Sequence, residues 1–152
     1  MNATRELFPL VSVDIALFSV DQSRLQVLLV KRAEEPAAKQ WALPGGILKP
    51  HLDDSLEAAA RRVLAHKVSV ELPLVEEVCT FSGPDRDPRG WSLSVLFYSL
   101  LPRDQVNALD GQAFFKLFAE LLKANPPSAE DAPLVEKLAK IGIVPGQDFD
   151  AA

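Results

Sequence analysis

Two glycines and the helix expected after them carry the residue types best suited to contact a ligand. Gly45 and Gly46 allow positive φ and a close approach of the backbone to a ligand. The segment 53–67 is predicted to be a helix, because it starts with acidic residues, continues with alanines and ends with basic residues. One face of this helix, near the glycines, is formed by positions spaced i, i+3 and i+4: Val63, His66 and Lys67.

The elements that must position these residues can be predicted from local patterns. The segments 10–20 and 24–32 are rich in β-branched and aliphatic residues and are joined by "VDQS", which predicts a hairpin. "WALPGGI" predicts a short strand that ends in a Gly-Gly turn. Two more strands, "LPLVEEVCTFS" and "GWSLSVLFYSLL", are expected on either side of "GPDRDPRG", which is interpreted as a long charged loop. The order strand, strand, strand, helix, strand, strand is a mixed α+β pattern.

The composition places the chain among ordinary single-domain globular proteins. It has 152 residues and a formal net charge of −5, which does not favour non-specific binding to nucleic acid or an anionic membrane. No apolar run approaches the roughly 20 residues that span a bilayer, and no signal peptide is evident at the start. The lone Cys79 excludes an intrachain disulfide. We therefore expect a cytoplasmic protein with no nucleic-acid and no membrane partner.

The composition then changes: from Asn107 onward the pattern is helical, and a helical hairpin is predicted. The first helix, 112–124, carries an apolar stripe and stops at "NPP". The second helix, about 129–140, has Leu134 and Leu138 on one face. The expected domains are 1–103 and a helical tail, 104–152, packed on the sheet.

The first hundred residues resemble the Nudix family, most specifically in "LLVKR", "WALPGG", "LEAAARR" and "TFSGPDRDPRGWSLSVLFYSL". The "PDRDPRG" segment and its flanks are similar to the branch that contains ADP-ribose pyrophosphatases and ADP-ribose-sensing repressors of nicotinamide metabolism. The resemblance covers residues 8–103. It implies an α/β/α sandwich with a mixed sheet, with the tail helices as the second cover.

The resemblance also places a Nudix box on this chain, and the box is degenerate. Gly46 matches its opening Gly, Asp54 stands where the first Glu is expected, and Arg62 matches the box Arg as a structural ion-pair donor whose Glu partner is lost. The three positions that carry metal-binding Glu in the family are occupied by Val63, His66 and Lys67.

These replacements argue against metal-dependent hydrolysis. Mg²⁺ prefers hard oxygen ligands and does not bind Val or an ammonium group, and His is a poor ligand for it. No metal and no cofactor is expected, and Mg²⁺ enters only if the chain is an active hydrolase. Two interpretations of Lys67 stay open: a solvated side chain near a helix C-terminus, or a charge that attracts a diphosphate which is bound and not cleaved.

Several further positions correspond to the neighbourhood of the nucleotide in the family. Arg86 and Arg89 could reach a phosphate or a ribose, or could be solvated in their loop. Trp91, at a strand start, is more typical of packing than of base stacking. The complete set of expected ligand-binding residues is Arg32, Gly45, Gly46, Lys67, Arg86 and Arg89.

The tail resembles something else. Residues 110–150 are similar to a segment of an uncharacterised bacterial family of exported-protein domains, and they lack the basic winged helix-turn-helix of the related repressors. Two unrelated halves would mean a natural fusion, a recombination product or an engineered chimera.

Three functions follow from these patterns. The favoured hypothesis is a catalytically inactive Nudix module that binds ADP-ribose-like nucleotide diphosphates. The alternatives are an active hydrolase of the ADP-ribose pyrophosphatase type and an interaction module without a small ligand. A homodimer is left open.

Overall fold

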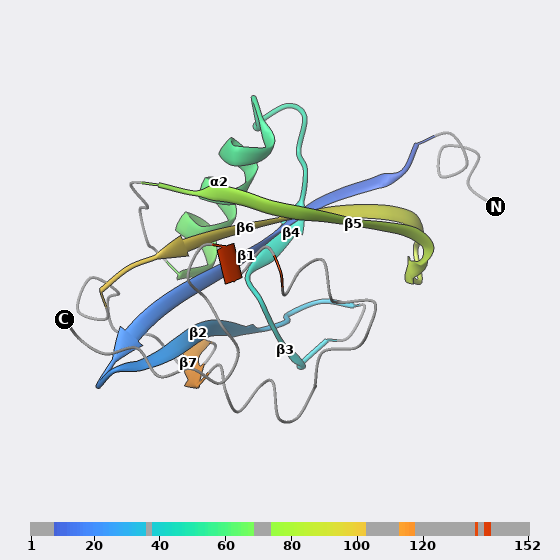
Figure 1. The fold of residues 1–152 in the computed structure, drawn as a ribbon. Helices are drawn as coiled ribbons and strands as arrows, with labels where there is room; N and C mark the ends of the chain where they lie inside the picture. Colours follow the sequence, from blue (N-terminus) through green and yellow to red (C-terminus); the bar gives the residue numbers. More distant parts are fainter. Residues whose placement is uncertain are drawn as a thin grey trace.

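The computed structural model describes residues 8–35, 38–68, 74–102, 113–117, 136 and 139–140, with the backbone alone for 67, 68 and 113–117. This part of the chain forms one seven-stranded mixed sheet and one long helix (Figure 1). The elements in chain order are β1 Leu10–Asp21, β2 Arg24–Lys31, β3 Trp41–Ala42, β4 Gly45–Ile47, α2 Leu56–Val68, β5 Glu76–Asp87, β6 Gly90–Leu100 and β7 Ala113–Leu117. The predicted mixed sheet and box helix are confirmed.

β1 is the strand around which the sheet is built. The main strand order is β3-β2-β1-β6-β5. β1 runs parallel to β6 from Leu10 to Phe18 and antiparallel to both β2 and β4. The β1–β2 hairpin closes with Asp21 opposite Arg24, and the two loop residues between them, Gln22 and Ser23, both have positive φ. That geometry suits the right-handed twist of a two-residue hairpin.

Alternating side chains divide the sheet into two faces. The α2-facing side of the sheet, which we call the helix face, holds Val13, Ile15 and Leu17 of β1 with apolar residues of β2, β6 and α2 in one buried cluster. The intervening residues of β1 point to the opposite side, which we call the polar face, where Ala16 and Phe18 belong to a second buried cluster. A period of two along one strand is sufficient to produce this division.

α2 covers the helix face because its apolar residues recur at helical spacing. The cluster on the helix face includes Leu56, Ala59, Ala60, Val63 and Leu64. Ser55 caps the helix by accepting a hydrogen bond from the backbone N–H of Ala58 at 3.0 Å. The small alanines let the helix lie close to the strands, which Figure 1 shows on one side of the sheet.

The Gly-Gly turn predicted at the end of "WALPGGI" is wrong. Gly45 and Gly46 lie in strand β4, and neither has positive φ. Both glycines are needed for close approach. A Cβ on Gly46 would stand 2.9 Å from Cγ2 of Val63 on the helix face, and a Cβ on Gly45 would meet Asp14 on the polar face.

The long charged loop predicted over 83–90 is also wrong. β5 continues to Asp87, and only Pro88 and Arg89 separate it from Gly90, the first residue of β6. Asp87 stabilises this tight turn by accepting a hydrogen bond from the backbone N–H of Arg89 at 2.8 Å, and Gly90 supplies a φ of +136°. The charged residues suggested a loop, whereas the hydrogen bond between the Asp87 side chain and the Arg89 backbone stabilises a tight hairpin.

The helix predicted to begin at residue 112 is contradicted by β7. Residues 113–117 pair antiparallel with β2, with Leu29 opposite Phe114 and Val30 opposite Ala113. Val30 also pairs with Ala42 of β3, so β7 lies along the other edge of β2. Cross-strand pairing therefore overrides the helical spacing of the apolar residues.

The remainder of the predicted tail lies mostly outside the described residues. Positions 136, 139 and 140 have helical backbone, within the second predicted helix, and Glu136 and Lys140 form an i,i+4 ion pair of 3.6 Å. The second helix of the predicted hairpin, its packing on the sheet and the boundary between 103 and 104 stay predictions. In the described part, no helix is long and apolar enough to cross a membrane.

The contact between Gly46 and Val63 can be tested by a double-mutant cycle. Gly46→Ala should lower the free energy of unfolding by about 1–3 kcal/mol, because the added methyl overpacks the α2–β4 contact. In a Val63→Ala background the same substitution should cost clearly less, because the colliding methyl is gone. Urea unfolding of the four proteins measures this. Additive losses would show that the two residues are not in contact.

Candidate functional site

The box face of α2 is apolar where it meets the sheet. Val63 is 3% exposed and belongs to the core, while His66, one turn later, is exposed. Lys67 lies in α2, but its side chain is outside the description, so both interpretations of it stay open. Ser69, at the position of the closing box Gly, lies outside the described residues.

The donor set does not fit a magnesium site. Within the described ranges, no group of three or more His, Cys, Asp or Glu side chains could hold a metal ion. At Gly46, the glycine that matches the start of the box, the nearest side chain is the buried isopropyl group of Val63, which offers no oxygen. The residues described here therefore do not match the ligands that Mg²⁺ requires.

The scaffold of the box is retained through an ion pair that the sequence did not predict. Arg62 donates from Nε to Oδ1 of Asp53 at 2.6 Å and from Nη2 to Oδ2 at 2.8 Å. Its Nη2 also donates to the carbonyl oxygen of Ile47 at 3.1 Å, and Asp53 accepts the backbone N–H of Lys49 at 2.8 Å. Arg62 is thus an ion-pair donor, as the resemblance implies, and Asp53 takes the place of the missing Glu partner.

Asp54, the residue aligned with the first box Glu, takes no part in this ion pair. It is exposed. Asp53 is buried, with 1% of its side chain exposed, and the side chain of Arg62 is 26% exposed. A bidentate pair with one buried partner fixes geometry better than a solvated pair. It ties α2 to the end of β4 and to the loop between them.

The Asp53–Arg62 ion pair shifts the pKa of both residues. The hydrogen bond from Arg62 lowers the pKa of Asp53 to about 2, against the opposing effect of burial and with help from the Lys49 N–H. The carboxylate in turn raises the pKa of Arg62. Both groups are therefore charged at neutral pH.

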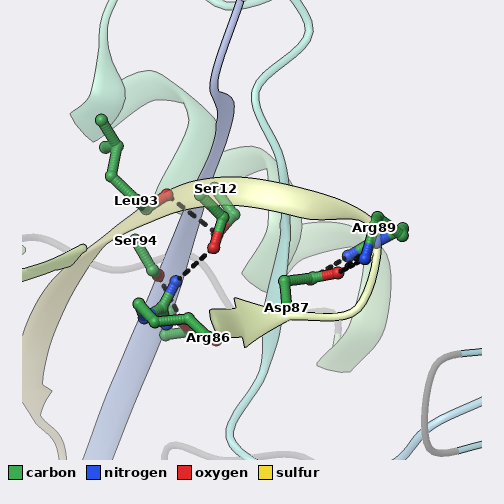
Figure 2. A network of polar contacts seen from close by, with 8 residues as sticks. Ser12, Arg86, Asp87, Arg89, Leu93 and Ser94 are labelled. Atoms are coloured by element: carbon green, nitrogen blue, oxygen red, sulfur yellow. Dashed lines mark hydrogen bonds and ion pairs between the residues drawn. The ribbon is translucent and has the colours of Figure 1, made fainter. Parts of the chain in front are cut away.

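The two arginines of the β5–β6 hairpin have different partners (Figure 2). Arg89 makes a bidentate pair with Asp87, from Nε at 2.9 Å and from Nη2 at 2.8 Å, and this pair lowers the pKa of Asp87 to about 2. Arg86 instead reaches back over the sheet and donates from Nη1 to Oγ of Ser92 at 3.0 Å. Arg86 is exposed, so its guanidinium retains donors for a ligand.

The polar face beside Arg86 holds a row of hydroxyl and carboxylate groups that the sequence analysis missed. Ser94 donates a short hydrogen bond from Oγ to Oδ2 of Asp14, and Ser12 donates to the carbonyl oxygen of Leu93 at 3.4 Å. Ser92 and Ser94 are each 1% exposed. Figure 2 shows Ser12, Arg86 and Ser94 gathered over β1 and β6. An acidic residue within the apolar "VSVDIALF" and serines at a spacing of two were the available signals.

The other expected ligand residues are more scattered. Gly45 lies against Asp14, so it adjoins the polar row, whereas Gly46 faces α2. Arg32 closes the loop after β2 through its backbone, with its N–H donating to Gln40 O at 2.8 Å and its carbonyl accepting Lys39 N–H at 2.7 Å. Trp91 is 47% exposed, which does not support the packing role that was favoured for it.

The fold and these motifs agree with the family comparison. The model of the NUDIX domain matches residues 9–138. The chain belongs to the Nudix family. The match extends through β7 and beyond the expected boundary at residue 103.

Two curated relatives share part of their length with this chain. The ADPR responsive transcriptional repressor NtrR of Acinetobacter baylyi is 45% identical over 93 residues, covering 61% of this chain and 37% of the relative. The ADP-ribose pyrophosphatase of Methanocaldococcus jannaschii is 33% identical over 92 residues, covering 60% of this chain and 50% of the relative. The chain thus spans half or less of these proteins.

Solved structures give the same result. The NUDIX domain of Shewanella oneidensis NrtR complexed with ADP ribose has a TM-score of 0.72 and 32% identity, covering 93% of this chain and 95% of that one. Shewanella oneidensis NrtR complexed with a 27mer DNA has a TM-score of 0.68 and 33% identity, covering 86% of this chain and 61% of that one.

The expectation of no nucleic-acid partner is contradicted by these similarities. One relative is a transcriptional repressor, and a similar solved structure contains DNA. The expectation rested on a net charge of −5, which averages over the whole chain. Such an average does not exclude binding through a local basic surface.

The Asp53–Arg62 pair predicts a specific pH dependence. An unfolded Asp titrates near ~3.9, and the folded pKa is about 2. The stabilisation is therefore fully present above about pH 4 and is lost as the pH falls toward 2. The difference in unfolding free energy between wild type and Asp53→Asn should be constant above about pH 4 and shrink below it.

Urea unfolding at a series of pH values measures this difference. Asp54→Asn is the matched control, because it changes the exposed neighbour, and it should follow the wild-type profile. A wild-type minus Asp53→Asn difference that does not shrink in acid would contradict the pairing.

Proposed function

We propose that this chain is a Nudix module that binds an ADP-ribose-like nucleotide diphosphate and does not hydrolyse it through a metal. The single observation that carries the proposal is Val63. In this position the family places a metal-binding carboxylate, and here an apolar side chain is buried in the core between α2 and β4. An apolar side chain offers no oxygen ligand to Mg²⁺.

The retained scaffold supports binding rather than loss of all function. The Asp53–Arg62 ion pair still holds the β4–α2 loop. Gly45 still packs closely against Asp14, and Gly46 against Val63. The polar row on the opposite face adds hydroxyl and carboxylate groups beside the exposed Arg86 that could contact a ligand. The similar NUDIX domain of Shewanella oneidensis NrtR is complexed with ADP ribose, which makes this ligand class the first to test.

Positive charge near the site would replace the metal as the partner of the diphosphate. Arg86 is exposed at the edge of the polar row. Lys67 is a further candidate by its place in the box. A guanidinium can bind phosphate oxygens through charge-assisted hydrogen bonds without any cation.

An active hydrolase is the second candidate, favoured by the 33% identity to an ADP-ribose pyrophosphatase. A coupled phosphatase assay with ADP-ribose and Mg²⁺ or Mn²⁺ separates the two. The proposal expects no turnover above a protein-free control. Robust phosphate release that a chelator abolishes would replace binding by hydrolysis as the function.

The charge-based binding predicts sensitivity to salt and to single charges. In EDTA, the affinity for ADP-ribose should fall as ionic strength rises, because partly exposed ion pairs are screened. Arg86→Gln and Lys67→Glu should each weaken binding by about 1–3 kcal/mol if the side chain contacts the diphosphate.

Calorimetry in EDTA measures these effects, with Arg24→Gln in the β1–β2 hairpin as the control at a site away from Arg86. A Lys67→Glu protein with wild-type affinity would show that Lys67 is only a solvated helix-end residue. No heat with ADP-ribose, NAD or nucleoside diphosphates would favour a module without a small ligand.

A further inference from the structure

We propose that the Asp14 carboxylate accepts a hydrogen bond from the nucleoside part of the ligand. Ser94 and Gly45 are the residues that position this carboxylate. This inference rests on the proposed binding function and specifies one contact within it. The donor is either the 2′-hydroxyl group of the adenosine ribose or the amino group of the base, which share the same chemistry toward a carboxylate.

The Asp14 carboxylate is held by one oxygen and leaves the other available. Oδ2 accepts the hydroxyl hydrogen of the buried Ser94. In the described part of the chain, Oδ1 has no hydrogen-bond donor and is not among the buried unpaired atoms. An unpaired carboxylate oxygen of a half-buried residue can accept a hydrogen bond from a ligand.

Gly45 makes room for this oxygen. Asp14 and Gly45 are paired residues of β1 and β4. A Cβ on Gly45 would collide with Oδ1 and would come within 2.9 Å of the Val13 carbonyl oxygen. Gly45 does not have positive φ, so its missing side chain is explained by the close approach of the Asp14 carboxylate and of the Val13 carbonyl oxygen.

An aromatic ring stands beside the same pair. Phe81 of β5 is the cross-strand partner of Ser94 and is 37% exposed. Cross-strand partners of an antiparallel pair lie on the same face, so the ring lies on the polar face next to Ser94, the residue that holds the Asp14 carboxylate. An exposed ring is a stacking surface for a base, and a carboxylate on the same face fits the donors of a nucleoside.

Asp14→Asn tests the contact with minimal change of shape. The amide oxygen can still accept the hydrogen bond from Ser94. The amide N–H₂ then faces the ligand, so that two hydrogen-bond donors oppose each other. Losing a hydrogen bond to a charged group should weaken ADP-ribose binding roughly tenfold to a hundredfold. Asp21→Asn, the same substitution at the exposed end of the same strand, should change affinity less than about twofold, in keeping with surface substitutions.

Calorimetry in EDTA with three ligands identifies the donor: ADP-ribose, its analogue without the adenosine 2′-hydroxyl, and the inosine analogue without the amino group. Wild type should bind one analogue more weakly, and Asp14→Asn should cost nothing further with that analogue. Ser94→Ala should reproduce part of the loss, and Ser94→Thr should restore it. Thermal melting of every variant verifies the fold.

Three results would overturn the inference or its basis, and they differ. Wild-type affinity in a folded Asp14→Asn protein excludes the contact while leaving ligand binding intact. An equal loss with all three ligands excludes a nucleoside donor. Absence of wild-type binding to ADP-ribose removes the proposed function itself.

Discussion

The close packing of α2 against β4 is the constraint on which the rest of the site depends. Gly46 has no side chain, and the Val63 methyl fills the space that this leaves. The Asp53–Arg62 pair then ties the helix to the carbonyl of Ile47 and to the intervening loop. Packing is sensitive to single methyl groups, so a carboxylate at position 63 would disturb the contact that supports the box.

This constraint divides two tasks between the faces of one sheet. On the helix face, β1 supplies apolar residues to the core, and α2 covers them. On the polar face, the alternate positions of the same strand hold Ser12 and Asp14 beside Ser94 and the exposed Arg86. Gly45 and Gly46 serve the two faces in turn, one admitting the Asp14 carboxylate and the other the Val63 side chain.

The elements with strong local signals could be predicted from the sequence. The β1–β2 hairpin, the box helix and the two long strands after it were expected within a few residues, because periodicity and turn residues determine them locally. The strand β7 was missed because "AFFKLF" also fits helical spacing, and only its pairing with β2 decides between the two.

The site was less predictable, because its contacts are decided by tertiary structure and not by local sequence patterns. The family motif directed attention to Asp54, whereas the structure pairs Arg62 with Asp53, its neighbour by one residue. Arg86 and Arg89 look alike in the sequence, and they differ in their partners: Arg86 reaches Ser92 across the β5–β6 hairpin, whereas Arg89 pairs with Asp87 beside the turn. The polar row combines residues about 80 positions apart, since Asp14 and Ser94 meet only because β1 and β6 run side by side.

The central claim is that the ligand is held by the chain's own charges and hydrogen bonds, without a metal. A calorimetric titration of ADP-ribose in EDTA, repeated in Mg²⁺ with the ligand recovered and identified by mass, tests it most directly. The account predicts the same dissociation constant in both buffers and intact ADP-ribose at the end. Binding that requires Mg²⁺, or recovery of AMP and ribose 5-phosphate, would contradict it.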